Sequence, residues 1–181
     1  VIGGGDTGSD CVGTANRQGA KKITQFEIMP KPLEWKETFN PVWPEWPLIL
    51  RTSSSHEEGC SRDWNISTKR FEGNGSIKKV ICCRVEWKSP GPGKPAQPAE
   101  IPGSEFSLEA DMVFLAMGFV HLEHARLINE LNVALDGRGF ISKTKDSYAT
   151  SVPKIYVAGD ADTGASLVVR AIYHGREAAK E

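Results

Sequence analysis

The fold is decided at the start of the chain by Val1-Ile2-Gly3-Gly4-Gly5-Asp6-Thr7-Gly8, which satisfies the pattern G-x-G-x-x-G. The following residues, 7–18, predict a helix, with Asp6 or Thr7 as its cap and Gly19 as its stop. Residues 23–28 are rich in β-branched and aromatic side chains and predict a strand. The order of strand, glycine turn, helix and strand therefore predicts a βαβ unit.

Each glycine of the motif has a mechanical role that only glycine fills. Gly3 permits a tight turn, Gly5 lets a pyrophosphate approach the backbone, and Gly8 lets the helix pack closely on the strand. The phosphates would meet the free N–H groups at the amino end of the helix. Glu27 closes the second strand about 20 residues after the motif, where a carboxylate binds the adenine ribose. The pattern predicts dinucleotide binding, against the alternative of an ordinary glycine-rich turn beside a surface glutamate.

Glu27 also bears on the choice of dinucleotide. Its charge would repel the ribose phosphate of NADP, and Lys31 is the sole basic residue in the stretch 27–32. NADH is therefore favoured over NADPH.

The middle of the chain predicts an insertion over about residues 29–110. Its first part, 29–47, carries five prolines and three tryptophans and is interpreted as an ordered surface excursion. Residues 64–72 and 76–88 flank Gly73-Asn74-Gly75, which predicts a β-hairpin with one buried face on its second strand. The Pro/Gly-rich connection 89–103 is expected to be extended and mobile.

The last third predicts a return to alternating strands and helices. Residues 111–118 form an apolar run ended by glycine, typical of a fully buried parallel strand at the sheet centre. Helix is expected at 123–131 and from about 164 to the end, and strand at 139–142 and 154–158. The composite is an α/β protein with a β-hairpin insertion.

Composition excludes several classes of protein. The 181 residues are 39% hydrophobic and 25% charged, with a net charge of −1, so neither nucleic acid nor an anionic membrane is an expected partner. No apolar run approaches membrane-spanning length, and no signal peptide is recognisable. The four cysteines lack metal-binding spacing, and His121 and His124 have no third ligand nearby, so no metal site is expected. His56 and His174 carry no pattern that indicates a role.

The whole chain resembles the carboxy-terminal half of the small (beta) subunit of glutamate synthase, or the matching region of its single-chain form. The residues that carry the resemblance are VIGGGDTGSDCVGTANRQGAKKITQFEIMPKP from Val1, VFLAMGF from Val113, and YATSVPKIYVAGDADTGASLVVRAIYHGREAAKE from Tyr148. Only two residues precede the glycines, where a strand of about 5–6 residues is usual. The chain is therefore expected to be cut from a longer protein.

The resemblance implies a flavoprotein with two dinucleotide-binding domains. Residues 1–118 would form a Rossmann-like NAD(P)H-binding domain and residues 119–181 the C-terminal segment of a split FAD-binding domain. The resemblance implies no catalytic side chain, because hydride transfer depends on stacked rings and exclusion of water. The cofactor-binding residues that it and the motif imply are Gly3, Gly5, Asp6, Thr7, Gly8 and Glu27 for NAD(P)H, Met117 and Gly118 near the nicotinamide, and Gly159, Asp160, Ser166, Leu167 and Val168 for FAD.

Such proteins pass electrons from NAD(P)H to FAD and on, through iron–sulfur clusters, to form glutamate from glutamine and 2-oxoglutarate. The resemblance implies a large subunit or domain as partner, iron–sulfur clusters only in the missing amino-terminal region, and a cytoplasmic or, in some eukaryotes, organellar location. The chain alone is expected to be inactive and to hold FAD poorly. The alternatives are a non-catalytic dinucleotide-binding or docking module, or a sibling NAD(P)H:flavin oxidoreductase subunit with another acceptor.

Overall fold

The structure is a computed structural model that describes residues 1–34 and 49–181. It divides into two compact units, Val1–Met117 and Gly118–Glu181. Most of the predicted tryptophan- and proline-rich excursion lies outside the described residues. Among the described residues, no helix is long and apolar enough to cross a membrane.

A parallel sheet carries the first unit. Strand β1 (Thr24–Glu27) pairs in parallel with β2 (Ser61–Trp64). On the other side of β1, Ile2 pairs in parallel with both Phe26 and Leu115. The order is therefore β2, β1, Ile2 and Leu115, which is the 3-2-1-4 order of a dinucleotide-binding half. The predicted βαβ unit is confirmed.

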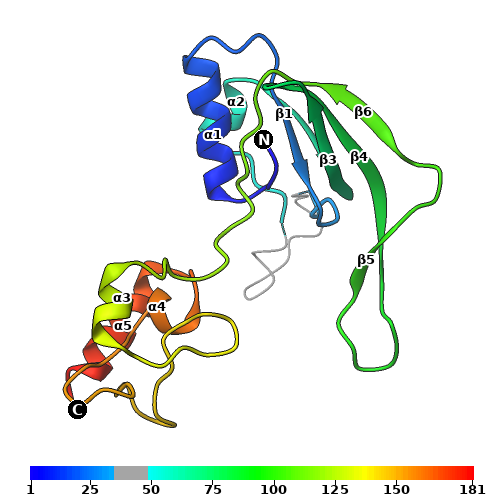
Figure 1. Cartoon of the computed structure of the whole chain (residues 1–181). Helices are drawn as coiled ribbons and strands as arrows, with labels where there is room; N and C mark the ends of the chain where they lie inside the picture. Colours follow the sequence, from blue (N-terminus) through cyan, green and yellow to red (C-terminus); the bar gives the residue numbers. More distant parts are fainter. Residues whose placement is uncertain (35–48) are drawn as a thin grey trace. The chain divides into compact units, whose positions relative to one another are not determined.

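Helix α1 (Asp6–Arg17) connects Ile2 to β1, as its sequence predicts (Figure 1). Val12 is fully buried, and Gly19 adopts a positive φ just beyond the helix. The predicted side-chain cap is wrong. The N-cap is Gly5, no side chain caps the helix, and Asp6 is its first residue. The free amides of the first turn are therefore left for other partners.

An antiparallel sheet is built on the predicted hairpin. Strand β3 (Ile66–Gly73) pairs with β4 (Ile77–Lys88), which also pairs with β5 (Gln97–Glu100) and β6 (Phe106–Glu109) (Figure 1). One detail of the prediction is wrong. Both faces of β4 are buried over residues 80–83, because Val80 and Cys82 pack against Phe26 while Ile81 and Cys83 are covered as well. The connection 89–103 is extended over β5, as predicted, and β5 is an edge strand, a place in a sheet that tolerates Pro98.

Residues 111–118 lie beside Ile2 in parallel, as predicted, but not as a fully buried central strand. Leu115 is 61% exposed and only Ala116 is buried. The reason is that the described residues place Ile2 on one side of this segment and no paired strand on the other.

The second unit contains α3 (Arg126–Leu131), α4 (Asp160–Thr163) and α5 (Val168–Ala178). The helix predicted from residue 123 begins three residues later. The strands predicted at 139–142 and 154–158 are wrong: these segments make only isolated bridges, Leu135 with Ile141 and Ala149 with Tyr156. Phe140 and Val157 are nevertheless buried. The apolar pattern therefore predicts their burial correctly, although these segments do not pair as strands.

Candidate functional site

The glycine turn is shaped by packing at both ends and is open in the middle. At Gly3, with φ +119°, an added Cβ would lie 2.6 Å from the Ala116 carbonyl carbon. At Gly8 it would overlap the Gly3 carbonyl oxygen. At Gly5 it would meet no atom within 4 Å. The geometry gives Gly3 and Gly8 the turn and packing roles expected of them, and leaves Gly5 as the one motif glycine that faces open space.

The open side of the turn coincides with the amino end of α1. Gly5, Asp6 and Thr7 are all exposed there. The first amides of an α-helix have no intrahelical partner, and the helix dipole favours a negative charge beside them. The main-chain N–H groups therefore suit a phosphate, whereas the Asp6 carboxylate carries the wrong charge to contact one directly.

Glu27 is held against this turn from the end of β1. One carboxylate oxygen, Oε2, accepts a hydrogen bond from the Gly4 amide at 2.6 Å, and Oε1 accepts one from the Met29 amide at 3.1 Å. The structure thus brings Glu27 to the glycine turn, as the motif predicts. Each oxygen has a further lone pair, so the carboxylate can still accept hydrogen bonds from a ligand hydroxyl.

Met117 and Gly118 follow the segment that borders the turn. The Ala116 amide donates to the Ile2 carbonyl at 2.7 Å, and the Met117 nitrogen lies 3.2 Å from a Cβ built on Gly3. Met117 is 66% exposed, and Gly118 has a positive φ. Met117 is therefore adjacent to the first motif glycine, and Gly118 begins the second unit.

A partly buried polar network lies beneath the turn, and the sequence patterns did not indicate it. Gln25 is 2% exposed, and its Nε2 donates to the Gly3 carbonyl at 3.0 Å. Its Oε1 lies 2.9 Å from Nε2 of His56. His56 belongs to the short helix α2 (Ser54–Glu57), which Ser53 caps, and Ser53 is hydrogen-bonded to Ser9 of α1. The only sequence signal is the Ser-x-x-His spacing of a capping box.

The surroundings of His56 favour its neutral form. Burial lowers the pKa of the imidazole, and the Arg62 guanidinium lowers it further. His56 is consequently neutral at pH 7.

In the second unit, the predicted flavin residues meet at the starts of α4 and α5. The Oδ1 atom of Asp160 accepts a hydrogen bond from the Ser166 amide at 3.2 Å. Gly159 has a φ of +70°, and a Cβ there would lie 3.1 Å from that of Ala171 on α5, so glycine allows close approach of the helix. Asp160, Ser166, Leu167 and Val168 are exposed. The structure brings these residues together around one turn, with Leu167 as the N-cap of α5.

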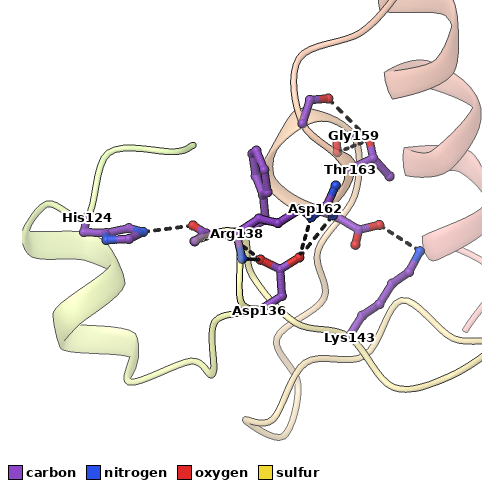
Figure 2. A network of polar contacts seen from close by, with 10 residues as sticks. His124, Asp136, Arg138, Lys143, Gly159, Asp162 and Thr163 are labelled. Atoms are coloured by element: carbon purple, nitrogen blue, oxygen red, sulfur yellow. Dashed lines mark hydrogen bonds and ion pairs between the residues drawn. The ribbon is translucent and has the colours of Figure 1, made fainter. Parts of the chain in front are cut away.

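Charged residues fix the loops that support this turn (Figure 2). Asp162 is buried, and its Oδ2 pairs with Lys143 Nζ at 2.7 Å. Asp136 accepts hydrogen bonds from the amides of Phe140 at 2.9 Å and Arg138 at 2.8 Å. These bonds, first the one from Phe140, hold the pKa of the Asp136 carboxyl below its usual value. Thr163 donates to the Gly159 carbonyl at 3.0 Å.

The histidine pair of the second unit makes local contacts. The rings of His121 and His124 stack with centroids 4.4 Å apart, and His124 Nε2 lies 2.8 Å from the Gly139 carbonyl oxygen. Both residues are exposed. Within residues 1–34 and 49–181, no group of three His, Cys, Asp or Glu residues is placed to hold a metal ion.

Comparison with known proteins agrees with this geometry. Residues 1–175 match the family described as pyridine nucleotide-disulphide oxidoreductase. The chain is 45% identical over 179 residues to the glutamate synthase [NADPH] small chain of Mycobacterium tuberculosis, covering 99% of this chain and 35% of that protein. It is 41% identical to the glutamate synthase [NADH] of Schizosaccharomyces pombe, covering 100% of this chain and 9% of that protein. The chain therefore spans about a third or less of these relatives.

Solved structures confirm the fold. FprA, a Mycobacterium tuberculosis oxidoreductase, is similar with a TM-score of 0.55 at 16% identity, covering 67% of this chain and 25% of that one. A second FprA structure, in complex with NADPH, gives a TM-score of 0.52. The predicted Rossmann-like α/β fold and the resemblance to glutamate synthase small chains are both confirmed. The chain belongs to the pyridine nucleotide-disulphide oxidoreductase family.

Proposed function

We propose that this chain is the part of a glutamate synthase small chain that binds NAD(P)H and completes the FAD site. The observation that carries the proposal is the open face at Gly5, flanked by two motif glycines that packing requires to be glycine. A pyrophosphate resting there would contact the backbone of Gly5, Asp6, Thr7 and Gly8. The glutamate synthase relatives, whose names specify NADPH or NADH, support the same assignment.

NADH is the favoured dinucleotide in this proposal. Glu27 lies at the turn with its carboxylate fixed by two amides, so a ribose diol could donate to it, whereas a ribose phosphate would meet a negative charge. Lys31, the nearby cation, is paired with Glu34 at 2.5 Å. Relatives of both kinds are known, since the Mycobacterium tuberculosis chain is named for NADPH and the Schizosaccharomyces pombe enzyme for NADH.

The FAD assignment involves Gly159, Asp160, Ser166, Leu167 and Val168. The exposed Asp160 carboxylate could accept a hydrogen bond from a ribityl hydroxyl while its other bond holds the Ser166 amide. The 11-residue helix α5 begins directly after Leu167, so its free amides could face the pyrimidine carbonyl of the flavin. Met117 and Gly118 would lie at the crossover between the nucleotide and flavin regions.

In the proposed reaction, this chain's residues bind and orient the cofactors and carry no acid or base. Bound flavin would supply the hydride acceptor, and the electrons would continue to the formation of glutamate from glutamine and 2-oxoglutarate. Iron–sulfur clusters would belong to another part of the parent, because Cys11, Cys60, Cys82 and Cys83 form no cluster-binding set. The partner would be the large chain or domain, and the location the cytoplasm.

Titration of the full chain with NADH and NADPH, followed by nicotinamide fluorescence, tests the proposal. We expect saturable binding of both, with NADH tighter. In the longer parent protein supplied with FAD, NADH should bleach the flavin absorbance. The substitution Asp160→Ala should release the flavin from that protein. A chain that binds neither NADH nor NADPH would refute the proposed function.

A further inference from the structure

The network beneath the glycine turn has a fixed direction. At one end stands the Gly3 carbonyl, which can only accept, so the Gln25 group facing it must be the Nε2 amide. The Gln25 oxygen then faces His56 Nε2, which must donate. At the other end, the Ser53 main-chain N–H can only donate, and it points to His56 Nδ1 at 3.1 Å. Both ends therefore require the same state of His56, neutral with its proton on Nε2.

The network also touches both ends of the glycine motif. Gln25 Nε2 binds the carbonyl of Gly3 and lies 2.8 Å from the position that a Cβ on Gly8 would occupy. Beyond His56, the Ser53 hydroxyl is hydrogen-bonded to the Ser9 hydroxyl, one residue after Gly8. The network therefore begins at the first glycine of the turn and returns to the helix that starts at its end.

We propose that Gln25 and His56 are positioning residues for the dinucleotide-binding turn, with the Nε2-protonated imidazole orienting the Gln25 amide that holds the Gly3 carbonyl. This inference rests on the proposed binding of NAD(P)H at the turn. Gln25 would not contact the dinucleotide, because it is buried under the turn, and His56 would act through Gln25. Their effect is to fix the direction of the Gly3 peptide and thereby the amides that follow it.

The chemistry of the imidazole supports this role. Protonation would place an N–H on Nδ1, which the Ser53 hydroxyl at 3.0 Å could accept, but the Ser53 main-chain N–H would then lose its acceptor. The lowered pKa of His56, caused first by burial and second by Arg62, keeps the neutral form that the network needs.

A matched pair of substitutions separates the two functions of the ring. In His56→Asn, the amide oxygen can replace Nδ1 and keep the cap on α2, but nothing reaches Gln25. In His56→Gln, the longer side chain can place its amide nitrogen at the position of Nε2 and restore the bond to Gln25. We expect NADH affinity to fall about 5- to 10-fold in His56→Asn, the loss of one partly buried hydrogen bond, and to stay within about 2-fold in His56→Gln.

Nuclear magnetic resonance of the full chain gives a readout that does not depend on the dinucleotide. The 15N shifts of His56 should report a neutral ring protonated on Nε2, and the Gly3 and Gly4 amide resonances should move in His56→Asn and not in His56→Gln. A ring protonated on Nδ1, or equal effects of the two substitutions on the turn, would overturn the inference. If the wild-type chain binds neither NADH nor NADPH, the proposed function fails, and these resonances still decide whether His56 positions the turn.

Discussion

Substitution of Gly8 by alanine tests how the turn is packed. Alanine in a helix normally raises stability by about 1 kcal/mol relative to glycine. At Gly8, however, the new Cβ would overlap the Gly3 carbonyl oxygen and lie 3.1 Å from its carbon and 2.8 Å from Gln25 Nε2. The obstacle is backbone, so no side chain can rotate away, and forcing a carbon into such a site costs about 1–3 kcal/mol. We therefore expect Gly8→Ala to lower the stability of the fold, the opposite of the usual effect of this change in a helix.

The measurement is urea unfolding of the full chain, followed by circular dichroism. We expect Gly8→Ala to lower the free energy of unfolding by about 1–2 kcal/mol and the midpoint by about 0.5–1 M urea. Gly5→Val is the matched control, because a Cβ there meets no atom within 4 Å. It should change stability by no more than about 1 kcal/mol while weakening NADH by about tenfold or more. A Gly8→Ala chain as stable as wild type, or a Gly5→Val chain with full affinity, would refute the reasoning.

Three other substitutions or conditions probe the same framework. Glu27→Gln keeps a hydrogen-bond acceptor for one of the two amides but removes the charge, so the ratio of NADPH to NADH dissociation constants should fall about 3- to 10-fold; an unchanged ratio would separate Glu27 from the ribose. The pKa of His56 is lowered in the folded chain, so the unfolded chain takes up the proton first as acid is added. The stability contributed by the neutral ring should be complete above about pH 6.5 and decline as the pH falls through the folded pKa, a slope that His56→Gln should remove in pH-dependent thermal unfolding. Lys143→Met leaves the buried Asp162 carboxylate without its cation, and since the Lys143 side chain is 32% exposed we expect a loss of about 1–3 kcal/mol in calorimetry, whereas a second change, Asp162→Leu, should recover part of it.

The sequence predicted those features whose cause is local. The glycine spacing predicts the turn and α1, and Gly73-Asn74-Gly75 predicts the β3–β4 hairpin, because the required backbone conformations belong to those residues themselves. Glu27 was placed at the turn correctly, since a strand of known length follows a helix of known length. Whether Glu27 contacts a ribose stays a prediction.

The features that the sequence did not predict depend on distant partners. Residues 154–158 have the apolar pattern of a strand, but a strand also requires a neighbour, and the described residues supply only the bridge at Tyr156. The sequence misplaces the cap of α1 because Asp6, which directly follows Gly5, is the better capping residue in isolation. The network beneath the turn joins positions 9, 25, 53 and 56, and no sequence period relates them.

The pairing of Ile2 has a consequence for how the turn would meet a ligand. Its amide donates to Phe114 at 2.8 Å, its carbonyl accepts from Ala116 at 2.7 Å, and the next amide, of Gly3, donates to Phe26 at 2.8 Å. The turn is thus hydrogen-bonded to neighbouring segments on both sides before any ligand binds. The entropic cost of ordering the turn is met when the chain folds and not when the ligand binds. A dinucleotide would therefore bind a preorganised turn, and more of its contact energy would appear as affinity.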